Sequence, residues 1–238
     1  MNIIFDMDDT LYDLMQPFKK AHQDLYSNKI ITDCNKLFMN SRIYSDKILE
    51  SEKKELISHK DCFYLRIKKT YYDIGIQISR KDAELFETKY RHYQSHITIP
   101  ENIVKVLNFC KTKHIFIALL SNGMHSSQYR KIQTLKLEQW FTNDKIFISE
   151  DTGYLKPDVN IFKFVEEKLH LLPDETWYVG DTYETDIKGA DNAGCNTIWF
   201  NHRNRMPPQP DNLADREVNS CTELLVVINE LYKNFDKV

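Results

Sequence analysis

Short runs of apolar residues recur along this chain, each bounded by charged or turn-forming residues. Runs of this length are too short for helices and are typical of strands buried in a sheet. They predict strands at residues 2–5, 115–120, 145–149, 176–179 and 196–200. Apolar side chains at helical spacing lie between or after these runs, at residues 101–112, 124–137, 161–171 and 221–232. This alternation predicts an α/β fold, with a Rossmann-like parallel sheet core flanked by helices.

Residues 14–97 do not follow this pattern and contain no convincing strand. Apolar positions three and four apart predict helices at residues 17–29, 45–59 and 63–72. Ser79 and Asp82 form a capping sequence for a further helix that runs through Tyr93. We therefore expect two domains. The core domain would comprise residues 1–13 and 98–238, and the helical cap domain, acting as a lid, residues 14–97.

Composition narrows the class of protein. Of the 238 residues, 42% are hydrophobic and 28% are charged, as expected for a soluble globular protein. The net charge of −3 predicts no general attraction to nucleic acid polymers or to anionic membranes. No apolar run reaches 18 residues, and Asp6 stands where a signal peptide needs its apolar segment. We therefore expect a cytoplasmic protein, a monomer or a homodimer, with its scattered cysteines as free thiols: Cys34, Cys62, Cys110, Cys195 and Cys221.

Acidic residues gather at the ends of the first and fourth predicted strands. Asp6, Asp8 and Asp9 follow the first strand, and Asp181 and Asp186 follow the fourth. Carboxylates this close repel one another, and a cation at the strand ends would offset the repulsion. Mg²⁺ prefers oxygen ligands, with one or two carboxylates beside waters and a substrate phosphate. The first segment alone leaves open a simple Asp-rich turn.

The second strand and the loop after the third carry groups that can hold an anion. Ser121, Asn122 and Gly123 end the second strand, and their hydroxyl, amide and backbone donors suit a phosphate. Pro157 favours the first position of a helix, which predicts that Lys156 lies at a helix N-terminus, where backbone amides favour an anion. An ordinary strand-to-helix turn and an unrelated surface Lys-Pro pair are the alternatives.

Taken in order, these segments resemble the four motifs of the haloacid dehalogenase-like superfamily. The motifs correspond to Asp6-x-Asp8-x-Thr10, to Ser121, to Lys156-Pro157 and to Gly180-Asp181 with Asp186. The resemblance covers residues 1–12 and 98–238, and the helical insert is similar to the commonest cap of that family. Because the dehalogenase branch lacks an acid at the position of Asp8, the sequence resembles the phosphatase branch.

The resemblance implies a role for each residue. Asp6 would attack phosphorus, Asp8 would act as acid and then as base, and Lys156 would complete the catalytic set. The phosphate-binding side chains would be Thr10, Ser121, Asn122 and Lys156. The Mg²⁺ cofactor would be bound by Asp6, by the carbonyl of Asp8 and by Asp181. Asp186 completes the expected metal site, where it could hold a water or Lys156 outside the direct ligands. The partner would be a small phosphorylated metabolite.

The substrate is less defined by the sequence. Residues 148–157 and 197–201 look like segments of bacterial pyrimidine 5′-nucleotidases, which suggests a nucleoside monophosphate. A sugar-phosphate phosphatase and a phosphoglucomutase-like enzyme have the same core motifs and remain alternatives. A non-catalytic ligand-binding protein on this fold is the alternative from another class, and it is disfavoured because the motifs retain their chemical groups.

Two features of the insert have ordinary interpretations that we prefer. His92 and His96 are four residues apart, a spacing found in zinc sites, but no third ligand is recognisable. Several tyrosines at helical spacing suit a core better than a ligand-stacking surface. They are Tyr64, Tyr71, Tyr72, Tyr90 and Tyr93.

Overall fold

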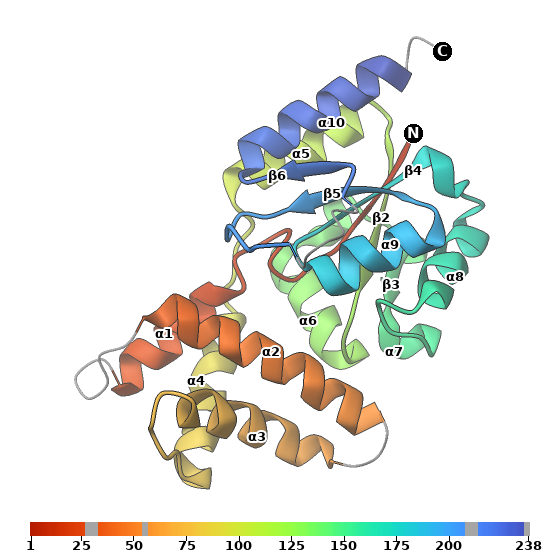
Figure 1. Ribbon diagram of the computed structural model, residues 1–238. Helices are drawn as coiled ribbons and strands as arrows, with labels where there is room; N and C mark the ends of the chain where they lie inside the picture. Colours follow the sequence, from red (N-terminus) through yellow and green to blue (C-terminus); the bar gives the residue numbers. More distant parts are fainter. Residues whose placement is uncertain (27–32, 54–56, 208–213, 236–238) are drawn as a thin grey trace. The chain divides into compact units, whose positions relative to one another are not determined.

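The computed structural model describes residues 1–26, 33–53, 57–207 and 214–235 (Figure 1). The chain divides into two compact units. One is formed by Met1–Asp13 together with Thr98–Val238, and the other by Leu14–Ile97. None of the helices in the described ranges is both long enough and apolar enough to cross a membrane.

The larger unit is built on a parallel sheet, which has six strands within the described residues. The strands are β1 (Asn2–Phe5), β2 (Phe116–Ser121), β3 (Ile146–Ile148), β4 (Thr176–Gly180), β5 (Asn196–Phe200) and β6 (Arg216–Val218). Their order is β3-β2-β1-β4-β5-β6, so β1 lies between β2 and β4. The expected Rossmann-like parallel sheet is confirmed, and each of the five expected strands is present.

The sixth strand was not predicted, and its composition explains why. β6 has three residues, of which Arg216 and Glu217 are exposed and only Val218 is buried. It pairs with β5 at the edge of the sheet, where a strand has a partner on one side only. A strand of this kind needs no run of apolar residues, so the apolar pattern does not reveal it.

Helices cover both faces of the sheet (Figure 1). The α-helices of this unit are α5 (Glu101–Thr112), α6 (His125–Leu135), α7 (Ser149–Thr152), α8 (Val159–Leu169), α9 (Lys188–Ala193) and α10 (Cys221–Phe235). Short helical turns are η1 (Leu137–Gln139), η2 (Asn143–Lys145), η3 (Pro173–Glu175) and the π-helical η4 (Tyr183–Ile187). Helix α5 packs against α10, and α8 packs against α9.

Alternate strand residues point to opposite faces, so each strand contributes to two layers of core. One layer joins strand residues to α8 and α9, through Ile4, Ala118, Leu120, Tyr178, Ile161, Phe162, Val165 and Ala190. The neighbouring positions Ile3, Phe5 and Leu119 are fully buried as well. Burial on both faces is the reason that the inner strands read as continuous apolar runs.

Two expectations about the segment before α8 are wrong. The segment after the third strand, expected to be a loop, begins with a short helix, α7, which ends before Gly153. Pro157 is not the first residue of α8, because the helix begins after Asp158, whose side chain accepts a hydrogen bond from the Asn160 N–H. The Asp158 N–H donates to the Leu155 carbonyl at 2.8 Å. Lys156 therefore lies in a turn ahead of the helix.

The described part of the smaller unit consists of helices and the segments that connect them. Its helices are α1 (Met15–Tyr26), α2 (Cys34–Lys53), α3 (His59–Tyr72) and α4 (Arg80–Gln94). The expected cap of α4 is confirmed, since the Ser79 side chain accepts a hydrogen bond from the Asp82 N–H. Helix α2 begins well before the expected start at residue 45, and the predicted helical residues 27–29 and 54–56 lie outside the described residues.

Aromatic side chains form much of the core of the helical unit. Phe18, Tyr71 and Phe86 are buried, and their rings pack on one another or on the rings of Phe38 and Tyr26. His22 Nδ1 lies 2.8 Å from the Tyr71 hydroxyl. The preferred core interpretation of the tyrosines is confirmed for Tyr71 but is wrong for Tyr72, which is 68% exposed.

Gly189 in α9 gives a test of core packing. A Cβ at this position would lie 2.7 Å from Cε2 of Phe162 and 3.1 Å from Cα of Pro157. In an uncrowded helix, Gly→Ala stabilises by about 1 kcal/mol, whereas overpacking costs about 1–3 kcal/mol. We expect Gly189→Ala to lower the free energy of unfolding by about 1–3 kcal/mol.

The measurement is urea unfolding followed by tryptophan fluorescence, because Trp140, Trp177 and Trp199 all belong to the larger unit. The matched control is Gly189→Ala in a Phe162→Leu background, where the crowding ring is absent and the loss should shrink. A Gly189→Ala protein as stable as the parent in both backgrounds would contradict this account of the packing.

Candidate active site

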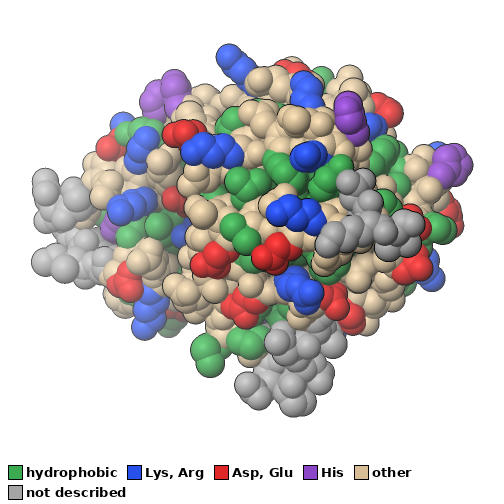
Figure 2. Space-filling view, turned by 90° about the horizontal axis from the view of Figure 1, so that it is seen from above, with side chains coloured by type: hydrophobic (Ala, Val, Ile, Leu, Met, Phe, Trp, Pro, Cys, Tyr) green, Lys and Arg blue, Asp and Glu red, His purple; other side chains and the backbone are tan. Residues whose placement is uncertain are grey.

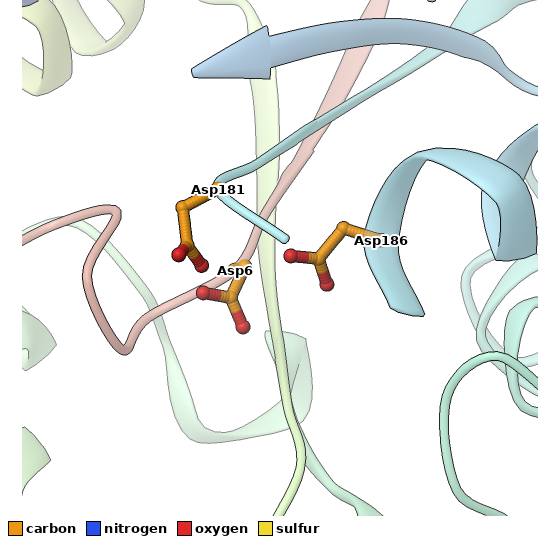
Figure 3. A group of neighbouring side chains, drawn as sticks. All are labelled: Asp6, Asp181 and Asp186. Carbon is orange, nitrogen blue, oxygen red and sulfur yellow. The ribbon is translucent and has the colours of Figure 1, made fainter. Parts of the chain in front are cut away.

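Three buried aspartates meet at the carboxyl edge of the sheet (Figure 3). Asp6 follows β1, Asp181 follows β4, and Asp186 lies in η4. Because β1 and β4 are neighbours, their ends bring Asp6 and Asp181 together. Each aspartate offers a carboxylate oxygen within 4.8 Å of the other two. Gly180 makes room for this arrangement, since a Cβ there would lie 2.5 Å from Cγ of Asp186.

Lys156 is the cation among these carboxylates. Its ammonium group is 2.7 Å from Oδ1 of Asp6 and 2.7 Å from Oδ1 of Asp186. It also donates to the hydroxyl of Tyr178 at 2.9 Å and to the Leu120 carbonyl at 3.3 Å. The side chain is 3% exposed, so water screens these interactions little.

Two arginines and a histidine from the loop after β5 reach the same edge of the sheet. Arg205 Nη2 lies 2.9 Å from Oδ2 of Asp181, and Arg203 pairs with the buried carboxylate of Asp9. His202 Nε2 lies 2.9 Å from the carbonyl oxygen of Asp9. Burial disfavours an ionised Asp9, but Arg203 and His202 hold the pKa of Asp9 well below its usual range. This loop therefore anchors the segment that follows β1.

The charge balance differs around Asp6. Burial raises the pKa of Asp6 to about 8, and the charges of Asp186 and Asp181 add to the effect of burial, while Lys156 opposes it. Burial also disfavours the Lys156 ammonium, but Asp186 and Asp6 raise the pKa of Lys156 well above its usual value. Three carboxylates thus share the positive charges of Lys156 and Arg205.

This donor set fits a divalent cation. Asp6, Asp181 and Asp186 present only oxygen ligands, which Mg²⁺ prefers. With all three aspartates ionised, the cluster carries one more negative charge than Lys156 and Arg205 neutralise, and buried charge is costly unless it is compensated. A divalent ion at this place would offset the excess and favour the ionised form of Asp6.

The residues expected to bind phosphate make other contacts in the structure. Thr10 Oγ1 donates to Oδ2 of Asp6 at 3.0 Å. The amide of Asn122 bonds both backbone groups of Lys156, accepting from its N–H at 2.9 Å and donating to its carbonyl at 3.0 Å. Ser121 is buried at the end of β2. Thr10 thus orients Asp6, and Asn122 fixes the turn that carries Lys156.

The Asp8 side chain is not part of the carboxylate cluster found among the described residues. Lys131 Nζ lies 2.8 Å from Oδ1 and 2.7 Å from Oδ2 of Asp8. The hydroxyl of Tyr12 donates to Oδ1 at 2.5 Å, and Nε2 of Gln128 donates to Oδ2 at 3.1 Å. The carboxylate therefore faces α6. If Asp8 binds a metal ion, it would do so through its backbone carbonyl.

The structure thus brings together Asp6, Asp181, Asp186 and Lys156, as expected from their places at strand ends or in the loop before α8. Sequence reasoning missed the residues that contact them from helices and loops. These are Gln128, Lys131, Tyr178, Arg203 and Arg205. A count of charge could have indicated the three cations among them, because five clustered aspartates require more cations than Lys156 supplies. His92, in the last turn of α4, and His96, just beyond the helix, contact each other locally, with His96 Nδ1 2.8 Å from the His92 carbonyl.

Comparisons with known proteins agree with this geometry. The family model described as haloacid dehalogenase-like hydrolase matches residues 3–200. A protein named HAD-hydrolase YfnB of Bacillus subtilis is 25% identical, covering 95% of this chain and 94% of that protein. A glyceraldehyde 3-phosphate phosphatase of Methanocaldococcus jannaschii is 25% identical, covering 98% of each. The N-acylneuraminate-9-phosphatase of Homo sapiens is 25% identical, covering 96% of this chain and 94% of that protein.

Solved structures show the same fold. A magnesium-bound crystal structure of the Bacillus subtilis protein matches with a TM-score of 0.70 at 24% identity, covering 96% of this chain and 98% of that chain. The structure of a dehalogenase matches with a TM-score of 0.76 at 19% identity, covering 95% and 96%. Because the family model extends over most of the chain and includes the ends of β1, β2 and β4, this protein belongs to the haloacid dehalogenase-like hydrolase family.

Proposed function

We propose that this protein is a magnesium-dependent phosphomonoester hydrolase that works through an aspartyl-phosphate on Asp6. The observation that carries the proposal is the arrangement at the edge of the sheet. A buried carboxylate, Asp6, lies against Lys156 and two further aspartates, and Asp8 follows two residues later. Phosphate monoesters are among the slowest substrates to react without a catalyst, and dense, preorganised charge of this kind is what their hydrolysis needs.

Asp6 and Asp8 have different roles in the proposed reaction. An oxygen of Asp6 bonds to phosphorus while the bond from phosphorus to the ester oxygen breaks. Asp8 gives its proton to that ester oxygen, which leaves as an alcohol. Asp8 then takes a proton from water, whose oxygen attacks phosphorus and breaks the bond to Asp6. Inorganic phosphate leaves, and both aspartates return to their initial states.

The surrounding side chains prepare these steps. Thr10 and Lys156 each bond one oxygen of Asp6, which fixes the direction of its carboxylate. The Lys156 ammonium also carries the positive charge that the phosphoryl oxygens need. Bound by Asp6, Asp181 and Asp186, Mg²⁺ would neutralise the carboxylates and polarise a phosphoryl oxygen.

Asp8 favours phosphate-ester chemistry over dehalogenation. An alkoxide is a poor leaving group and benefits from a proton donor, whereas a halide leaves without one. The relatives named as phosphatases support the same choice, while the dehalogenase structures are less than 25% identical and show the fold alone. A mutase would use the same two aspartates, so the products must be identified to exclude it.

We propose that the substrate is a phosphate ester of a primary alcohol on a small polar metabolite. Two relatives are named for glyceraldehyde 3-phosphate and for N-acylneuraminate 9-phosphate. In both compounds the phosphate is on a terminal CH₂O group, as it is in the nucleoside 5′-monophosphates suggested by the sequence. We further propose that Leu14–Ile97 acts as the cap that selects among such esters.

Metal dependence is the first test. We expect Mg²⁺ to stabilise the folded protein by about 2.7 kcal/mol at one hundred times its Kd, because it binds the folded state only. Asp181→Asn should lose this stabilisation, while Asp174→Asn, which changes an exposed acid, should keep it. Differential scanning calorimetry measures both. Activity should vanish in EDTA, and Ca²⁺ should inhibit because it takes more ligands at longer distances. Full activity in chelator would contradict the metal assignment.

The two leading aspartates should respond differently to amide substitution. Asp6→Asn removes the nucleophile, so it should form no phosphoenzyme and show no turnover. Asp8→Asn should lose only the ~10²–10⁴-fold that general acid–base groups contribute. The loss should be smallest with p-nitrophenyl phosphate, whose leaving group needs little protonation. Rates are measured by phosphate release and the intermediate by ³²P labelling. Label on Asp6→Asn, or parental rates of Asp8→Asn on an alkyl phosphate, would contradict the assigned roles.

A screen of matched esters tests the substrate class. Nucleoside 5′-monophosphates, glyceraldehyde 3-phosphate and N-acylneuraminate 9-phosphate carry primary esters, and nucleoside 3′-monophosphates are matched secondary esters. We expect kcat/KM to favour the best primary ester by at least about 10-fold over the secondary ones. ³¹P NMR follows the products and separates hydrolysis, which gives inorganic phosphate, from mutase activity, which gives an isomeric ester. Equal rates on 5′- and 3′-monophosphates would contradict the proposal.

A further inference from the structure

The inner face of α6 contains polar residues where apolar residues are expected. Its buried positions are Gln128, Lys131, Ile132 and Leu135, at the spacing of one helical face. A helix that covers a sheet normally fills such positions with apolar side chains. Burying an ammonium and an amide costs free energy unless each is paired, and apolar residues of similar size often serve stability as well or better. Polar residues at core positions that break this rule are candidates for a functional role.

Both polar residues of this face reach Asp8. The Lys131 ammonium contacts both carboxylate oxygens, and the side chains of Lys131 and Asp8 are only 8% and 15% exposed. Gln128 Nε2 donates to Oδ2 of Asp8 at 3.1 Å and lies 2.8 Å from Oγ of Ser121. Its contact with the Asn122 carbonyl completes a link between Asp8 and the end of β2. Gly123 leaves room for Gln128, because a Cβ there would lie 3.0 Å from its amide.

We propose that Lys131 is a positioning residue that acts through Asp8, with Gln128 as its second support. This inference rests on the function proposed above. A free carboxylate side chain samples several rotamers, and each wrong rotamer separates it from the ester oxygen. Lys131, Gln128 and Tyr12 hold Asp8 in one place before substrate arrives. The entropy cost of ordering the Asp8 side chain is therefore met during folding. Lys131 and Gln128 also donate toward the negative charge that Asp8 gains when it gives up its proton.

The test measures how kcat/KM depends on the leaving group, using a series of substituted phenyl phosphates with p-nitrophenyl phosphate at one end. In a reaction with a covalent intermediate, kcat/KM covers only the steps through release of the alcohol. A misplaced Asp8 protonates the leaving oxygen less well, so poor leaving groups suffer most. We expect Lys131→Met to lose ~10–10²-fold on the poorest leaving group, within the range for general acid–base groups, and less than about 3-fold on p-nitrophenyl phosphate.

A double-mutant cycle separates positioning of Asp8 from other roles. In an Asp8→Asn background, Lys131→Met should cause no further loss, because the group that it positions is already gone. Lys131→Arg keeps the charge and can donate to both oxygens, so it should restore most of the leaving-group profile. The matched control is Arg130→Met, which removes an exposed positive charge from the neighbouring position of α6 and should leave the profile unchanged.

The outcomes distinguish this inference from the function it rests on. If the parent protein hydrolyses no aryl phosphate with Mg²⁺, the proposed function fails. If the parent is active but Lys131→Met lowers kcat/KM by the same factor for every ester, then Lys131 does not act through Asp8. The same conclusion holds if Lys131→Met lowers kcat/KM further in the Asp8→Asn background. Circular dichroism shows whether each variant is folded. If Lys131→Met is not, Lys131→Gln removes the charge but keeps a donor, and a leaving-group profile identical to the parent's would equally overturn the inference.

Discussion

The Lys156 ammonium is the group on which the organisation of this site depends. It lies between Asp6 and Asp186, is nearly inaccessible to water, and also contacts Tyr178 and the Leu120 carbonyl. Without it, carboxylates from two strand ends would face one another in a buried space, which is one of the more costly arrangements in a protein. The pairing is therefore a condition for β1, β4 and the loop before α8 to meet as they do.

The position of Lys156 is itself fixed by β2. Asn122, which follows that strand, bonds both backbone groups of Lys156, so the turn containing the lysine is held by a neighbouring strand end. The sequence suggested that Asn122 would touch the phosphate. Its actual partners are backbone groups of the turn, and its contribution is to hold the cation in place. Loops alone would position such a group poorly, whereas the rigid sheet edge gives it a defined location.

The strand ends are what could be predicted from the sequence. Buried parallel strands produce apolar runs, and parallel strands end at one edge, so Asp6, Ser121 and Asp181 could be placed together before the structure was known. The expected helix at 101–112 has the bounds of α5, because its apolar face is regular and the chain turns at either end. The sequence pattern was clear for strands that are buried on both faces and for helices that bury one face at regular spacing.

Other parts of the fold and the site give no such signal. β6 has one buried residue and therefore gives no apolar run. The start of α8 depends on capping by Asp158, but the preceding Pro157 itself favours the first position of a helix and so pointed to an earlier start. Lys131 lies in a helix whose buried face departs from an ordinary amphipathic pattern only at Gln128 and Lys131. Arg203 and Arg205 follow β5 in an irregular segment, and their acidic partners, Asp9 and Asp181, follow β1 and β4. Long-range pairing of charges leaves no local periodicity to detect.

The two leading aspartates show why these unpredicted residues matter. Asp6 and Asp8 are identical side chains two positions apart, yet the proposed reaction requires one to be a nucleophile and the other to transfer protons. Local sequence cannot separate such roles, and the surroundings must do so. Asp6 lies among two further carboxylates and Lys156, a setting that suits a cation. Asp8 faces the donors of Lys131, Gln128 and Tyr12, which hold a carboxylate without excess negative charge. Two of the three donors to Asp8 come from α6, and this helix therefore contributes to the division of labour together with the segment after β1 that carries both aspartates.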